Sequence, residues 1–246
     1  AGRVDGATER IGQIIAGLLS PGDTLQLGLG KVQAAVLKNL EDAQGLGFHG
    51  GMISTPILEP LRRGVFSLGV TTGVALGSED LYREAGQSTQ MRFAPVGYTH
   101  SIHTLAGIPR FVSVNSVLEV DLFGQANAEM LGGRQVSGQG GLVDFVRGAR
   151  ASKGGRSILA LASTADGGNI SRIVPALAQG TAITVARGDV DLVVTEHGVA
   201  DLRLASLEER AERIVAVADP KFRKALREEW ERSRAGPPAT VSPGTS

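Results

Sequence analysis

The sequence contains no cysteine among its 246 residues. This absence excludes disulfide bonds, thiolate catalysis and a thiolate zinc site, and it gives no sign of an oxidising compartment. The chain also lacks an excess of either charge, since 25 basic and 25 acidic residues give a formal net charge of +0. We therefore expect no bulk attraction to nucleic acid or to an anionic membrane, and neither is predicted as a partner.

Two further absences concern targeting. No apolar run approaches the length needed to span a membrane, and residues 1–11 do not have the layout of a signal peptide. These features predict a cytoplasmic protein. The chain begins at Ala1 without a methionine, so a larger precursor and an excised domain both remain open.

The composition that is present is typical of a globular protein, with 42% apolar and 20% charged residues. The 34 glycines indicate many tight junctions between strands, loops and helices. Neither an internal repeat nor a linker is evident. We predict one domain over residues 1–235, followed by a disordered tail over residues 236–246.

Segments typical of strands alternate with segments whose apolar residues recur at helical spacing. The expected strands cover residues 24–29, 47–54, 70–76, 91–95, a run that starts at Phe111, 157–162 and 192–195. The expected helices cover residues 7–19, 32–40, 57–63, 79–84, 99–106, 142–147, 170–177, 207–217 and 220–234. This alternation predicts an α/β fold with a largely parallel sheet flanked by helices.

Residues 111–149 form the stretch in which we most expect chemistry. An apolar, β-branched run opens the stretch, and acidic and amide side chains follow it. The stretch closes on the glycine loop Ser137-Gly138-Gln139-Gly140-Gly141 and a short helical pattern. A glycine loop that opens a helix places backbone N–H groups where an anion or a developing negative charge is stabilised.

A second glycine motif, Gly28-Leu29-Gly30, lies between an expected strand and an expected helix. Such a loop could hold a pyrophosphate. Tight turns between strands and helices also use glycine for steric reasons alone, so the motif does not by itself indicate a ligand.

Three groups of titratable residues each have a catalytic and a structural interpretation. His100 and His103 have metal-ligand spacing on one expected helix, but no carboxylate or third histidine completes a metal set, which favours a surface or core pair. Glu119 and Asp121 would share one face of a strand, either as a catalytic pair or as partners of nearby polar groups. His197 follows the last expected strand, where α/β proteins place ligands, although Thr195 is more simply the cap of a following helix.

From these residues alone, the prediction is an α/β protein with glycine loops suited to a phosphate-bearing ligand. Several ordered motifs carry a closer resemblance: they are Ser113–Gln125, Ser137–Phe145, Lys153-Gly154-Gly155, Gly168–Pro175 and Val194–Leu202. Together they resemble the second half of the acetyl-CoA hydrolase/transferase family, which includes 4-hydroxybutyrate CoA-transferase-like enzymes. The resemblance covers about residues 11–222.

The resemblance implies a CoA-transferase-like (NagB/RpiA-type) domain that acts on an acyl-CoA and a small carboxylic acid or water, with coenzyme A as substrate and no metal. In this family, a glutamate attacks the thioester and carries CoA as a covalent glutamyl thioester. Backbone N–H groups would stabilise the oxyanion. The residues implied to contact CoA are Gly28, Leu29, Gly30, Ser137, Gly138, Gly140 and Gly141, with Gly141 beside the thioester.

Two positions depart from the family pattern. The nucleophilic glutamate belongs to a His-Thr-Glu-Met-Ile-Ser type motif, and this chain has His49-Gly50-Gly51-Met52-Ile53-Ser54, with Gly51 at the glutamate position. Asp166 stands where the family commonly has a lysine that helps hold CoA, and a carboxylate there would repel phosphates. The resemblance also implies that the family's first half belongs either to a separate subunit or to a missing part of the chain, and that the protein is a homo-oligomer or a complex with that half.

Three hypotheses follow from the resemblance and its departures. The protein is a CoA-transferase or acyl-CoA hydrolase, a non-catalytic subunit, or an enzyme that cleaves a CoA ester without the glutamate by hydrolysis or C–C cleavage. In the third case the candidate bases are His49, Glu119 and His197.

Overall fold

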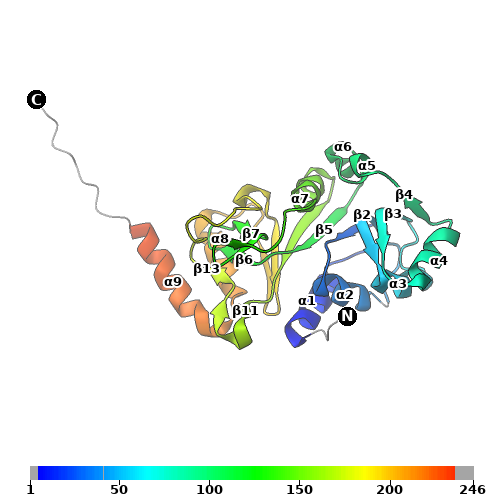
Figure 1. Ribbon diagram of the computed structural model, residues 1–246. Helices are drawn as coiled ribbons and strands as arrows, with labels where there is room; N and C mark the ends of the chain where they lie inside the picture. The colour runs from blue at the N-terminus through cyan, green and yellow to red at the C-terminus, as the bar shows by residue number, and fades with distance from the viewer. Residues whose placement is uncertain (1–4, 41, 236–246) are drawn as a thin grey trace, which may run out of the picture.

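The computed structural model describes residues 5–40 and 42–235, and an eight-stranded sheet forms its framework (Figure 1). In spatial order the strands are β15 (Gly198–Asp201), β14 (Leu192–Thr195), β10 (Arg156–Ala160), β5 (Phe111–Ser116), β1 (Thr24–Leu27), β2 (Gly47–Ser54), β3 (Val70–Leu76) and β4 (Met91–Phe93). Neighbouring strands are parallel except β14 and β15, which pair antiparallel. The predicted α/β class with a largely parallel sheet is confirmed. The predicted tail at residues 236–246 lies outside the described residues.

Helices cover both faces of the sheet (Figure 1). They are α1 (Gly6–Gly17), α2 (Lys31–Lys38), α3 (Leu58–Arg62), α4 (Glu79–Gln87), α5 (Val96–Thr99), α6 (Ile102–Ala106), α7 (Leu142–Ala151), α8 (Leu207–Ala216) and α9 (Pro220–Ala235). Short 3₁₀ turns occur at η1 (Thr55–Ile57), η2 (Asp166–Gly168) and η3 (Arg187–Asp189). In the described part of the chain, no helix has the length and apolar character needed to cross a membrane.

Successive side chains along a strand point to opposite faces of the sheet, so the apolar core is divided between these two faces. Along β10, Ile158 and Ala160 join the apolar cluster under α1 and α2, whereas Leu159 and Leu161 join the cluster that contains α8. On β5, Phe111 packs with side chains of α6 and α7. Each fully buried large side chain of this kind contributes roughly 1.5–3 kcal/mol to the free energy of folding.

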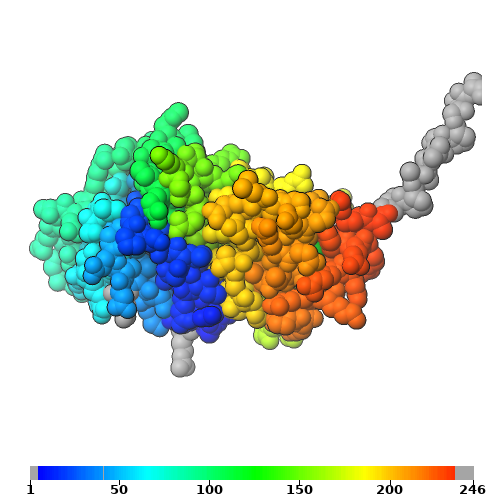
Figure 2. Space-filling view, turned by 180° about the vertical axis from the view of Figure 1, so that it is seen from behind, coloured from blue at the N-terminus to red at the C-terminus, as the bar shows by residue number. Residues whose placement is uncertain are grey.

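Both views place α9 and α4 at opposite ends of the molecule (Figures 1 and 2). Helix α8 begins with a capping box, in which the Ser206 hydroxyl accepts the Glu209 N–H and the Glu209 carboxylate accepts the Ser206 N–H. In Figure 2, α1 and the C-terminal helices share one face, and α1 contacts the edge strand β15 and its neighbour β14.

Several short strands lie outside the main sheet. They are β6 (Glu119–Asp121), β7 (Ala126–Asn127), β8 (Met130–Leu131), β9 (Arg134–Gln135), β11 (Thr164–Ala165), β12 (Ile170–Ser171) and β13 (Ile173–Val174). The helix expected at residues 170–177 is therefore wrong, because β12 pairs with β11 and β13 pairs with β6. Ile170, Ile173 and Val174 favour strands, and Pro175 cannot continue a helix.

The helix expected over residues 99–106 is two helices. Helix α5 ends at Thr99, with His100 as its C-cap residue, whose N–H donates to the Val96 carbonyl. Helix α6 starts after Ser101, which has an extended backbone. His100 and His103 therefore do not form a pair one turn apart on a single helix. Because of this break, the direction of the His100 side chain is not set by α6.

Thr195 caps no helix, contrary to expectation. Its hydroxyl donates to the Val217 carbonyl at 2.6 Å and accepts the His197 N–H at 3.0 Å. Gly198, with φ of 138°, then starts the return strand β15. Glycine adopts such a positive φ without the steric cost that a β-carbon brings.

Candidate functional site

The order of the strands reverses between β1 and β5. The chain runs from β1 through β2 and β3 to β4 in one direction, and then from β5 through β10 to β14 in the other. In open α/β sheets, ligands bind outside the carboxyl ends of the strands at such a switch point. The described structure has a cavity of about 390 Å³ at this place, which we call the switch-point cavity.

The walls of the switch-point cavity come from six regions of the sequence. They are the end of β1 with its loop, strand β2, the residue after α5, the end of β5, the residue after β7, and the glycine loop with the start of α7. The lining residues are Gln26, Leu27, Gly28, Leu29, Gly51, Met52, His100, Asn115, Ser116, Ala128, Ser137, Gly138, Gln139, Gly140, Gly141, Leu142 and Phe145. Six of the seven residues predicted to contact CoA are among them, and Gly30 is the residue that precedes α2.

A buried polar network forms the floor of the switch-point cavity. The Gln26 side-chain carbonyl accepts from the Ser113 hydroxyl at 2.9 Å and from the Asn115 amide at 3.1 Å. The Asn115 amide also donates to the Ser113 hydroxyl at 2.8 Å. A β-carbon on Gly28 would lie 2.9 Å from Asn115 Oδ1, so glycine is required for the β1 loop to approach β5 this closely. The network fixes the side chains of the floor.

The first turn of α7 meets the cavity without a side-chain cap. Gly141 precedes the helix, and its side-chain position is filled by a neighbouring ring. Within the described residues, the N–H groups of Gly141 and Val143 make no hydrogen bond. Free N–H groups at a helix start stabilise negative charge, which suits an oxyanion or a carboxylate.

Gly51, where the resemblance implied the family's glutamate position, lies on β2 and lines the cavity. A β-carbon at this position would lie 2.8 Å from His100 Cε1 and 3.0 Å from His100 Nε2. The imidazole therefore occupies the space that a side chain at position 51 would enter.

None of the three bases expected from the sequence lines the switch-point cavity. Glu119 accepts the Asn127 side-chain amide at 2.8 Å. His197 is next to Glu196, whose carboxylate accepts the Ser163 N–H and hydroxyl. Asp121, fully buried, accepts the N–H groups of Phe123 and Gln125. These carboxylates are held by hydrogen bonds within the fold.

His49 is buried behind the cavity wall, with 4% of its surface exposed. Its Nε2 lies 3.0 Å from the Thr99 carbonyl, and because a carbonyl only accepts, this nitrogen carries the proton. Burial is the largest influence on the pKa of His49 and lowers it, although the hydrogen bond to Thr99 acts in the opposite direction. The neutral ring ties β2 to the end of α5.

His100 is the cavity residue that the sequence analysis assigned to a surface or core pair. Its Nδ1 lies 2.9 Å from the Thr99 hydroxyl, and its ring centroid lies 4.5 Å from that of Phe145. The only signal that could have placed it in the cavity was the break after α5, which the helical pattern hid. His103 is exposed on α6.

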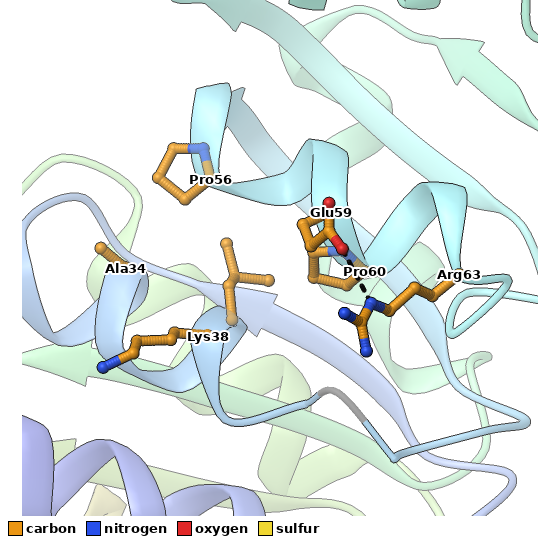
Figure 3. Close-up of a pocket in the computed structure, with 7 residues that line it drawn as sticks. Ala34, Lys38, Pro56, Glu59, Pro60 and Arg63 are labelled. Atoms are coloured by element: carbon orange, nitrogen blue, oxygen red, sulfur yellow. Dashed lines mark hydrogen bonds and ion pairs between the residues drawn. The ribbon is translucent and has the colours of Figure 1, made fainter.

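Other features of the described structure lack the residues predicted to contact CoA. The close-up in Figure 3 shows a second cavity, between α2 and α3, with none of the predicted site residues. Its volume is about 220 Å³. Its charged groups have partners, since Arg63 pairs with Glu59 at 2.8 Å and Lys38 with Glu9 at 3.1 Å. Among the described residues there is no cluster of three or more histidine or carboxylate side chains that could hold a metal ion. Asp166 is exposed and lines no part of the switch-point cavity.

The fold and the cavity define an open, mostly parallel α/β protein with a glycine-lined site at its switch point. The family model described as the acetyl-CoA hydrolase/transferase C-terminal domain matches residues 77–230. The chain belongs to the acetyl-CoA hydrolase/transferase family.

Curated relatives include CoA transferases from two bacteria. The chain is 39% identical over 230 residues to the 4-hydroxybutyrate coenzyme A transferase of Clostridium kluyveri, covering 90% of this chain and 54% of that protein. It is 39% identical over 232 residues to the succinyl-CoA:cyclohexane-1-carboxylate CoA transferase of Geobacter metallireducens, covering 91% and 53%. The chain thus spans about half the length of the curated relatives it matches.

Solved structures also match nearly the whole of this chain and about half of their own length. RipA from Yersinia pestis superposes with a TM-score of 0.89 at 35% identity, covering 95% of this chain and 55% of RipA. The 4-hydroxybutyrate CoA-transferase from Porphyromonas gingivalis superposes with a TM-score of 0.82 at 41% identity, covering 95% and 57%.

Proposed function

We propose that the switch-point cavity binds the thioester end of an acyl-CoA. The chain would then contribute one half of an enzyme that hydrolyses the thioester or passes CoA to a small carboxylic acid. The observation that supports this most directly is the convergence of the β1 loop, the β5 end and the start of α7 on one cavity. The β1 loop and the glycine loop before α7 are the segments that the family resemblance implied for CoA.

The chemistry of the lining fits this ligand. Glycines let the backbone approach a thioester closely, and the helix start offers N–H groups for the negative charge that develops on its carbonyl oxygen. The family's remaining half, as a covalently linked domain or a separate subunit, would close the cavity. The relatives named above act on acyl-CoA and carboxylates by their names, which supports the substrate class.

The first test of the proposal is whether the protein binds CoA. Calorimetry with CoA and acetyl-CoA would use the complete protein together with any separately encoded first half. Gly138→Phe puts an aromatic ring into the cavity-lining loop, and we expect it to weaken CoA binding by about tenfold or more, a change of roughly 1.4 kcal/mol. Gly188→Phe is the matched control, because Gly188 is exposed, has open space around its Cα and lies outside this cavity. Absence of CoA binding in the wild-type protein would refute the proposal.

The absence of a side chain at Gly51 supports a second candidate, a non-catalytic subunit that keeps the fold for assembly or ligand sensing. It predicts CoA binding with no turnover. Release of thiol from acetyl-CoA, butyryl-CoA or succinyl-CoA by the purified complete protein would rule it out.

A further inference from the structure

Four groups surround the imidazole of His100 and fix it at the position that a nucleophile on β2 would occupy. One edge of the ring, Cε1 and Nε2, faces Gly51, and the Cδ2 and Nε2 atoms lie against the side-chain position of Gly141. Phe145 packs against the ring face, and the Thr99 hydroxyl contacts Nδ1. Any side chain at position 51 or 141 would collide with this ring, so the two glycines make its placement possible.

The contact with Thr99 determines what Nε2 can do. Thr99 is fully buried, so its hydroxyl holds a fixed position. When Nδ1–H donates to the Thr99 oxygen, Nε2 has a free lone pair directed to the space between the two glycines. A neutral imidazole in this tautomer is a general base. His49 supports the arrangement, because its bond to the Thr99 carbonyl anchors the end of α5.

We propose that His100 is the general base of this protein and replaces the family's glutamate, so that acyl-CoA is hydrolysed by direct attack of water. Nε2 takes a proton from water while the water oxygen bonds to the thioester carbonyl carbon. The carbonyl oxygen becomes an oxyanion beside the N–H groups at the start of α7. When the carbonyl re-forms, the C–S bond breaks, and the CoA sulfur takes the proton from Nε2. No covalent bond to the protein forms at any step.

This inference rests on the proposed binding of acyl-CoA, and the experiment separates the two. Thiol release from acetyl-CoA, butyryl-CoA and succinyl-CoA is measured for the complete wild-type protein, His100→Gln and the control His103→Gln, with CoA binding measured in parallel. General-base catalysis typically contributes 10²–10⁴-fold, so we expect His100→Gln to lose about 100-fold or more in kcat while CoA binding changes less than about threefold. His103→Gln should keep the wild-type rate, because His103 is exposed on α6 and outside the cavity.

Three further readouts distinguish a base from a structural residue. The pH dependence of the wild-type rate should disappear in His100→Gln. Thr99→Val should lower kcat less than His100→Gln does, and Thr99→Ser should restore it. Hydroxylamine, which traps a glutamyl thioester, should leave wild-type turnover unchanged.

A double substitution tests the steric part of the proposal. Gly51→Glu alone should remain inactive in CoA transfer, since its β-carbon would meet His100 Cε1. Gly51→Glu combined with His100→Ala should gain CoA transfer that hydroxylamine inhibits. Three results would overturn the proposal while leaving CoA binding in place: an unchanged rate in folded His100→Gln, hydroxylamine inactivation of the wild type, or no turnover of any acyl-CoA tested. Failure of the wild type to bind CoA would instead refute the proposed function itself.

Discussion

The switch-point cavity and the small β13-β6-β7 sheet are both rich in polar residues, but they use them differently. In the small sheet, Asp121 and Glu119 accept hydrogen bonds from neighbouring N–H groups. In the cavity, the N–H groups of Gly141 and Val143 and the Nε2 atom of His100 have no hydrogen-bond partner among the described residues. The comparison teaches that residue type alone does not identify a catalytic group. A side chain whose hydrogen-bonding atoms are all occupied within the fold is not available to bind a substrate or to exchange a proton with it.

Removal of a buried carboxylate that accepts several hydrogen bonds is expected to have the largest effect on stability. Asp121→Ala deprives three backbone N–H groups and the Gln125 side-chain amide of their acceptor in a fully buried place. We expect the free energy of unfolding to fall by about 3–5 kcal/mol in urea denaturation. Glu231→Ala, at an exposed position of α9, should change it by less than about 0.5 kcal/mol. If both variants behaved alike, the contrast between the two regions would fail.

Overpacking of the cavity should have the next largest effect. Gly141→Ala places a methyl group against the His100 ring, and we expect a loss of about 1–3 kcal/mol in urea denaturation. In a His100→Ala background the same change should cost at least about 1 kcal/mol less, because residues in contact are coupled. Gly138→Ala, with open space around it, is the control. Additive effects would show that His100 does not fill this space.

The pH dependence of stability should report His49. Burial lowers the pKa of His49 in the folded protein, so the unfolded chain binds the proton more readily. The contribution of His49 to the free energy of unfolding is therefore complete above its pKa of about 6.5 in the unfolded chain. This contribution is lost as the pH falls from there through the lowered pKa of His49 in the folded protein. Urea denaturation between pH 5 and 8 should show a slope of at most about 1.4 kcal/mol per pH unit from this group, and His49→Asn should lack it. An identical slope in the variant would assign it to other groups.

The smallest effects are expected at the bases that the sequence suggested outside the cavity. His197→Ala and Glu119→Gln should keep thioester hydrolysis within about twofold of wild type, well below the 10²–10⁴-fold that a general base contributes. Steady-state thiol release measures this. A large loss in kcat at either position, with CoA binding and folding intact, would transfer the chemistry from the cavity to these residues.

The sequence predicted the main sheet well because apolar runs and glycine breaks are local signals. Strands β1, β2, β3 and β14 lie at or within two residues of their expected positions. The errors arose where pairing with a distant segment decides the structure. Ile173 and Val174 form a strand because β6 lies beside them, which no local pattern contains.

The same limit applies to the candidate site. The glycine loops could be predicted because their motifs are contiguous, and the structure brings them to one cavity. The place of His100 could not be predicted, because it depends on two glycines, Gly51 and Gly141, that lie 49 and 41 positions away in the chain. Only the fold brings these three residues together.

The meeting of His100 with Gly51 has a consequence for how this protein can change over generations. A single substitution that placed glutamate on β2 would bring its β-carbon to 2.8 Å from His100 Cε1, so the new side chain needs the space that the imidazole fills. Exchange of the imidazole for a glutamate at this place would therefore require substitutions at both positions 51 and 100.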